Sequence, residues 1–109
     1  MRLVKSYDLA SLSVTHSAGS WKLPFARAKL TVVQEYGTFL WYIDVEGVTD
    51  ERLLSFFAGT EEIDVIVEAT TIGGRRLQGD AYFHPNPRHK AAAIRGQGEL
   101  QGYSPNADR

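Results

Sequence analysis

Apolar and polar side chains alternate along most of this sequence, and the alternation is most regular between Glu62 and Phe83. A period of two is typical of β-strands with one buried face. Gly73 and Gly74 divide this stretch into two halves and supply the positive φ angles that a tight turn requires. The pattern therefore predicts a long β-hairpin over residues 62–83.

The register of this hairpin follows from the requirement that the apolar sides of its two strands meet. A two-residue turn would pair Val67 with Asp80 and place a carboxylate against the apolar side. A loop one residue longer pairs Val67 with Ala81 and keeps the apolar face continuous. The sequence therefore favours the longer loop, with a β-bulge near Arg75.

The rest of the sequence predicts four more strands and one helix. The same alternation predicts strands over 7–16, 25–36, 38–48 and 91–102. Apolar residues recur with helical spacing over 49–59, where Thr49 can cap the helix and Gly59 suits a left-handed terminus. Gly96 and Gly98 occupy alternate positions of the last strand, which is typical of a bulge or of a second backbone passing close by.

These elements predict a mainly β fold, an antiparallel β-sandwich or partly closed β-barrel of about six strands with one short α-helix. A chain of 109 residues matches a single domain. We assign the domain to 1–102 and expect 103–109, which lack a pattern, to form a flexible tail. The sequence does not decide whether a barrel interior is filled or hollow. A ligand pocket in the barrel mouth, lined by Trp21, Trp41 and the helix residues Phe56 and Phe57, therefore stays open.

Composition narrows the class of function only slightly. Hydrophobic residues make up 43% and charged residues 23% of the chain, as in ordinary soluble globular proteins. The formal net charge of −1 gives no overall attraction to nucleic acid or to an anionic membrane. The chain has no cysteine and no run of the ~20 apolar residues that a membrane span needs. Lys5, Ser6 and Asp8 interrupt the apolar residues near the N-terminus, so we expect a protein made without an export signal. These features predict a soluble, cytoplasmic protein without a membrane partner.

Residues that could carry catalysis are few and scattered. His16 lies near Ser17, but no G-x-S-x-G turn accompanies the pair. His84 and His89 share a proline-containing loop, although transition-metal sites generally need three or four converging ligands. The sequence therefore predicts a protein that is not an enzyme, with no catalytic residue, no metal site and no cofactor.

Apolar residues on the outward sides of the strands point to association. Tyr42, Ile66 and Tyr82 share the sides occupied mostly by polar residues, and Ile66 and Tyr82 are direct cross-strand neighbours in the favoured register. An apolar spot outside the core marks an interface. We expect the chain to form homo-oligomers through these three residues, with the turn from Gly73 to Arg76 as a contact loop.

Basic residues support an alternative, a binding module for nucleic acid. The candidate side chains are Arg27, Lys29, Arg75, Arg76, Arg88 and Lys90. The groups at 75–76 and 88–90 lie at opposite ends of a predicted strand, roughly 30 Å apart at ~3.3 Å per residue. Acidic residues lie among the others, and the net charge argues against strong phosphate binding. Nucleic acid is therefore a less favoured partner than a second copy of the chain.

The order of the predicted elements resembles that of phage tail-tube proteins. A hairpin over 25–48, a short helix over 50–58, the long hairpin and a closing strand follow one another, and the segment AAAIRGQGEL after GDAYF is similar to the last strands of that family. The resemblance implies a ring-forming β-barrel whose sheet continues across subunits and which stacks into a tube. It also implies a structural protein of phage or prophage origin, virion-associated, with other assembly proteins as partners.

Overall fold

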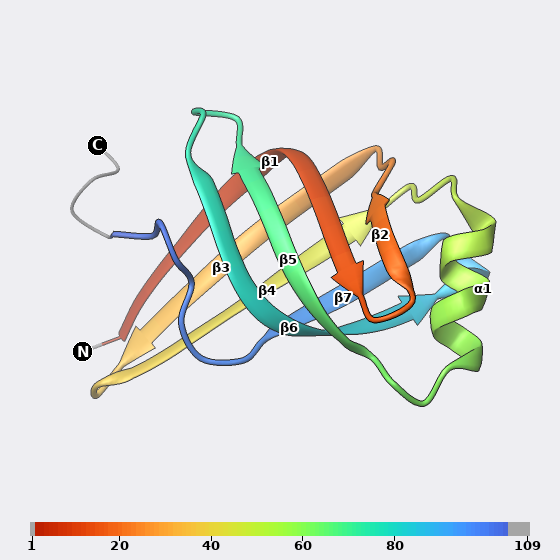
Figure 1. The fold of residues 1–109 in the computed structure, drawn as a ribbon. Coiled ribbons are helices and arrows are strands. Elements are labelled where there is room, and N and C mark those ends of the chain that lie inside the picture. Colours follow the sequence, from red (N-terminus) through yellow and green to blue (C-terminus); the bar gives the residue numbers. More distant parts are fainter. Residues whose placement is uncertain (1, 105–109) are drawn as a thin grey trace.

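The computed structural model describes residues 2–104, which form seven strands, one α-helix and one 3₁₀ helix (Figure 1). In chain order these are β1 (Arg2–His16), β2 (Gly19–Lys22), β3 (Arg27–Glu35), β4 (Thr38–Glu46), α1 (Glu51–Gly59), β5 (Asp64–Thr71), β6 (Arg76–Asn86), η1 (Pro87–His89) and β7 (Ala91–Gly96). The predicted mainly β fold with one short helix is confirmed.

Six of the strands close into an antiparallel barrel in the order β1-β3-β4-β7-β6-β5, and β5 pairs back with β1 (Figure 1). Closure removes the two free edges that an open sheet would have. The seventh strand, β2, lies beside the end of β1, and the sequence pattern missed it because its four residues show little alternation. Of the two predicted architectures, the structure is the barrel, and the barrel is closed.

The long strand β1 joins the two ends of the sheet. Its first half pairs with β3, and its second half pairs with β5 from Leu9 onward. The register shifts between Leu9 and Ser11, which is the signature of a β-bulge. Because of this bulge, Leu9 and Leu12 both point into the core although they are three residues apart.

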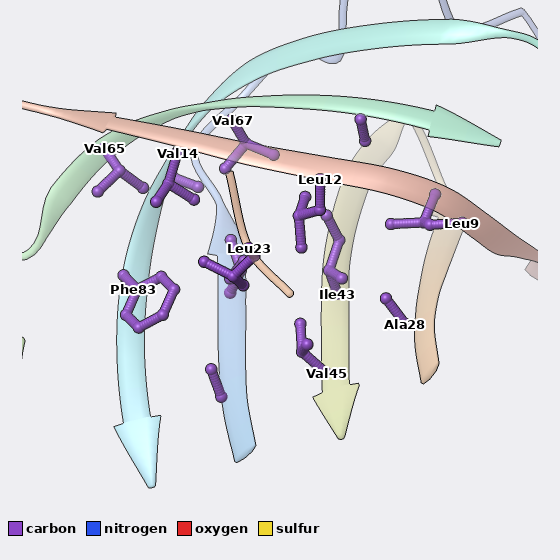
Figure 2. Close-up of a cluster of buried hydrophobic side chains, with 14 of the residues drawn as sticks. Leu9, Leu12, Val14, Leu23, Ala28, Ile43, Val45, Val65, Val67 and Phe83 are labelled. Carbon is purple, nitrogen blue, oxygen red and sulfur yellow. The ribbon is translucent and has the colours of Figure 1, made fainter. Parts of the chain in front are cut away.

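A single cluster of buried hydrophobic side chains occupies the barrel interior. Figure 2 shows Leu12, Val14 and Leu23 meeting Ile43 and Phe83 inside the barrel. Small barrels are commonly filled in this way. The interior is therefore a packed core, which answers the question that the sequence left open.

The helix α1 covers one end of the barrel (Figure 1). Its N-terminal cap is Asp50, whose carboxylate accepts a hydrogen bond from the Leu53 amide (3.1 Å), and not Thr49 as predicted. A carboxylate at this position also favours the positive end of the helix dipole. At the other end Thr60 is the cap, in an extended conformation, so Gly59 does not provide the expected left-handed residue.

The hairpin of β5 and β6 has the expected loop length but a different register. Val67 pairs with Gly79 and not with Ala81. The shift of two residues keeps each side chain on its expected side, because the side-chain period of a strand is two. The apolar face is thus continuous, as predicted, while every predicted cross-strand pair of the hairpin is wrong.

Local hydrogen bonds determine where this loop lies. The Thr71 amide donates to the Arg75 carbonyl (2.9 Å), so the three loop residues are 72–74 and not 73–75. The Thr71 hydroxyl accepts a hydrogen bond from the Arg75 amide (3.0 Å), and Gly74 takes a positive φ of 95°. The Gly74 amide also donates to the Thr71 carbonyl (2.9 Å). A glycine with positive φ at the end of a three-residue loop forms a G1 bulge with the next residue, so the predicted bulge near Arg75 is confirmed.

The end of the barrel opposite α1 is organised by Trp41, which is 2% exposed. Its indole ring lies against the backbone of Gly96 and Gly79, and a Cβ atom on Gly79 would come within 2.7 Å of the ring. A Cβ atom on Gly96 would overlap the ring outright. At Gly96 the close neighbour is thus the ring of Trp41 and not the second backbone that the glycine pattern suggested. β7 ends at Gly96, earlier than predicted.

After β7 the chain bends around the indole and returns to the sheet. The Trp41 Nε1–H donates to the Gly98 carbonyl (3.2 Å), and Gln101 then pairs with Gln78 through two backbone hydrogen bonds (2.7 and 3.0 Å). We call residues 97–104 the C-terminal strap. In this strap Leu100 is buried, so the strap completes the core at this end.

Part of the predicted tail is packed against the barrel. The Tyr103 ring contacts Tyr7 edge-on and Phe39 at a tilt, with ring centroids 5.9 and 5.8 Å apart, and the two tyrosine hydroxyls lie 3.2 Å apart. The contacts thus extend beyond the domain boundary expected at residue 102. The rest of the predicted tail, 105–109, lies outside the described residues.

The close approach of Trp41 can be tested by substitution. Gly96→Ala is expected to destabilise the fold by about 1–3 kcal/mol, because the added methyl group forces the buried indole to move. Gly59→Ala is the matched control, since a Cβ atom there meets nothing within 4 Å. Urea unfolding of both variants measures the difference, and equal stabilities would contradict the packing described for Trp41.

Candidate interaction surface

The structure brings together two of the predicted contact residues. Tyr42 and Tyr82 flank Arg95 in one outward row across β4, β7 and β6. Both tyrosines are partly exposed, at 40% and 39%. Ile66 pairs with Asp80, so its predicted direct contact with Tyr82 is wrong, because the hairpin loop lies one residue earlier than expected.

Closure of the barrel separates the other predicted contacts. Six strands complete a circle, so the outward direction turns by roughly 60° from one strand to the next. Tyr42 on β4 and Ile66 on β5 are three strands apart and face opposite sides. Gly73 lies in the hairpin loop and Arg76 begins β6 next to it, at the end of the hairpin that projects from the barrel (Figure 1). The predicted contact residues therefore do not face one common direction.

An apolar surface that the sequence analysis missed covers the outer side of β1, β3 and β4. Val4 pairs with Val33, and Val33 pairs with Leu40, so the three side chains form one row. Tyr42 is the next outward residue on β4. Val4 and Leu40 are 50% and 56% exposed, and Val33 between them is 9% exposed. We call these four residues the outer patch.

A signal for the outer patch is present in the sequence. Val33 follows Val32, and Leu40 precedes Trp41, so each pair interrupts the alternation with two consecutive apolar residues. Neighbouring residues of a strand point to opposite faces. Such pairs therefore make a strand apolar on both faces, which is typical of strands that are covered on both sides.

Val4, Val33 and Leu40 of the outer patch lie where the sheet continues beyond the closed barrel, and Tyr42 lies at the start of that extension, where β4 still pairs with β7. On β1, pairing with β5 begins only at Leu9, and on β4, pairing with β7 stops at Tyr42. The strand segments 2–8, 30–35 and 38–41 therefore form a three-stranded sheet extension. The C-terminal strap crosses its inner face, where Tyr103 packs on Phe39, while the outer patch occupies its outer face.

Polar side chains surround the outer patch. Beyond it, Arg2 and Glu35 form an exposed ion pair with 3.7 Å between Nε and Oε2. On the barrel side, Ser6 lies in the next outward row, and Arg95 stands beside Tyr42. An apolar centre with a polar rim is the usual anatomy of a protein–protein contact.

The six basic candidate residues do not gather on one surface. They divide between the α1 end of the barrel, with Arg27, Lys29, Arg88 and Lys90, and the β5–β6 turn, with Arg75 and Arg76. Asp44 and Glu46 lie directly across from the two basic residues of β3. The arrangement separates the positive charges and places acids among them, which is unfavourable for binding a phosphate backbone.

Hydrogen bonds occupy both ring nitrogens of His16, which is buried under α1. Nδ1 accepts a hydrogen bond from the Ala18 amide (3.0 Å), so Nε2 carries the proton and donates to the Glu62 carbonyl (2.8 Å). The Ser17 hydroxyl donates to the Glu62 carboxylate (3.0 Å). The geometry therefore gives His16 a structural part in holding the β1–β2 turn. The Ser17 hydroxyl lies 3.5 Å from Nδ1, farther than from its Glu62 partner.

Aromatic rings surround His16 at this end of the barrel. Phe56 and Phe57 meet the imidazole edge-on, with centroids 5.2 and 5.5 Å away, and Trp21 contacts all three rings. These rings were candidates for lining a ligand pocket, but they fill the barrel mouth by packing on one another. Trp41, the other candidate, lies at the opposite end.

Within residues 2–104, no three histidine, aspartate or glutamate side chains lie close enough together to hold a metal ion. The same part of the chain has no helix with the length and apolar character needed to cross a membrane.

Fold and surface together define a small antiparallel β-barrel with a filled interior, whose sheet extension carries an apolar patch. Comparisons of the chain with protein-family models, with curated proteins and with solved structures find no match. The resemblance to phage tail-tube proteins therefore stays a prediction from the order of elements.

The structural part assigned to His16 can be checked by unfolding experiments. His16→Ala is expected to cost at least about 1–3 kcal/mol, because it leaves the partners of both ring nitrogens without their hydrogen bonds. His84→Ala is the control, since that side chain is exposed on β6. Chemical denaturation of the two variants gives the comparison, and an equally small effect at both positions would refute this assignment.

Proposed function

We propose that this chain is a non-enzymatic structural protein that assembles with copies of itself, and that the outer patch lies at the contact between copies. The observation that carries the proposal is the sheet extension with apolar residues on both faces. The strap covers the inner face, whereas Val4 and Leu40 on the outer face remain half exposed. Burying these side chains against another surface would be favoured by about 25 cal/mol per Å² of apolar area.

The charges around the outer patch favour a second copy as the partner. The rim carries both signs, with Arg2, Glu35 and Arg95 close to the patch. The chain as a whole has a formal net charge of −1. A surface with mixed charges does not select a strongly basic or strongly acidic partner, and it can complement itself. A stable contact commonly buries about 800 Å² on each partner, so the four apolar residues would form its centre and the rim would complete it.

The order of elements supports placing this assembly in a phage or prophage structure, with other assembly proteins as further partners. The packed interior and the divided basic residues give no support to the alternatives of a ligand pocket or a nucleic-acid surface. The experiment below therefore tests assembly itself.

A charge placed in the outer patch is expected to weaken assembly. Light scattering over a wide concentration range should give a mass above that of one chain. Leu40→Lys should raise the protein concentration at which half of the chains are assembled by at least about tenfold, as expected for a residue at the centre of a contact. Ile66→Lys is the matched control, because Ile66 is 41% exposed on the opposite side of the barrel and should leave the mass unchanged.

Two results would contradict the proposal. One is a wild-type chain that remains a monomer at every concentration. The other is an oligomer that Leu40→Lys leaves intact.

A further inference from the structure

The two edges of β4 differ. β3 pairs with β4 along its whole length, whereas β7 pairs with it only from Tyr42 onward. The chain leaves β4 after Gly96, because the Gln97 amide turns to the Asp80 carbonyl (2.8 Å).

Thr38 and Leu40 direct their backbone groups toward β3, because neighbouring residues of an antiparallel strand face opposite edges. The backbone groups of Phe39 and the amide of Trp41 face the other edge, where β7 pairs with no residue of 38–41. This edge therefore presents two donors and one acceptor that β7 does not use.

The residues of this edge do not protect it. Proteins usually guard a strand edge with a charged side chain, a proline or a bulge. Segment 38–41 is Thr-Phe-Leu-Trp and contains neither a charge nor a proline. It pairs with β3 in an unbroken register. An edge of this kind accepts another strand.

A groove of about 560 Å³ lies on the inner face of the sheet extension, between β4 and the C-terminal strap. Phe39, Leu100 and Tyr103 supply apolar walls, and Gln34 adds an amide. The charged residue of the lining is Glu99, whose side chain is exposed. The groove offers space for a side chain directly beside the unpaired edge.

These features define the chemistry of an occupant. A segment added along 38–41 would point alternate side chains into the groove beside Phe39 and across the outer face beside Leu40. Both sets must be apolar to match, and Glu99 favours a lysine or arginine next to them. We propose that the edge of β4 binds an extended segment of a different protein, about four residues long and apolar on both faces, by strand addition.

A second copy of this chain does not supply such a segment. Within residues 2–104, the runs of alternating apolar residues belong to the barrel strands, and their inward side chains are buried in the core. The connections between strands are polar or glycine-rich, and 105–109 has the sequence PNADR. A copy would have to unfold a strand of its own barrel to occupy the groove. The occupant is therefore distinct from the copies that would meet at the outer patch.

Selection from a displayed library of random twelve-residue peptides, with the full chain as target, tests the inference. Enriched peptides are expected to carry about four consecutive apolar residues beside a lysine or arginine. Once synthesised, they should slow hydrogen exchange at the amides of Phe39 and Trp41, which face the open edge, by at least about tenfold at saturation. The same peptides with alternate backbone nitrogens methylated keep their side chains but lose the hydrogen bonds of one edge, and should bind at least about tenfold more weakly.

A pair of variants tests the charge preference. Glu99→Lys should weaken binding of the basic peptides several-fold, whereas Glu61→Lys, an exposed site beside α1, should not. The inference is overturned if no peptide is enriched, if methylated and unmethylated peptides bind alike, or if protection appears elsewhere. It is also overturned if the amides of Phe39 and Trp41 become protected when the protein alone is concentrated, because a second copy would then cover the edge. A wild-type chain that stays monomeric contradicts the proposed assembly without affecting this inference.

Discussion

The packing of Trp41 against Gly79 and Gly96 is the constraint on which the structure of the barrel end opposite α1 depends. The indole occupies the space in which side chains at Gly79 and Gly96 would lie. β7 ends at Gly96, against which the ring packs, and beyond it the Gln97 amide donates to Asp80 on β6 while the indole N–H donates to the Gly98 carbonyl. The departure of β7 leaves one edge of β4 without a partner and leaves the strand ends as a sheet extension. A single buried ring thus links the core to the surface that we propose for assembly.

The alternation of apolar residues predicted the strands and their buried faces, because burial imposes a period of two on any half-covered strand. It could not predict the position of the β5–β6 loop, which depends on the hydrogen bonds of Thr71 to Arg75. It also missed the outer patch. The consecutive apolar residues Val32-Val33 and Leu40-Trp41 indicate strands that are apolar on both faces, but only the pairing shows that the outward residues Val4, Val33 and Leu40 lie in one row. Closure itself rests on the pairing of β1 with β5, which no local pattern reveals.

The surfaces that the fold leaves uncovered define the proposed function better than any reactive group. The two ends of the barrel differ in this respect. At the α1 end, the rings around His16 fill the mouth and its hydrogen bonds are all made within the chain. At the other end, the outer patch and the β4 edge lie side by side on one sheet extension. Contacts with other proteins are therefore expected at the sheet extension, at the end of the barrel opposite α1.

The central claim is that copies of the chain meet at the outer patch. Isotope-filtered NMR on a mixture of labelled and unlabelled protein tests it most directly, because only contacts between copies give cross-peaks. The account predicts such peaks at the methyl groups of Val4, Val33 and Leu40. Cross-peaks confined to the methyl groups of Ile66 or Ile72, or the absence of any peak at concentrations where the mass shows an oligomer, would contradict it.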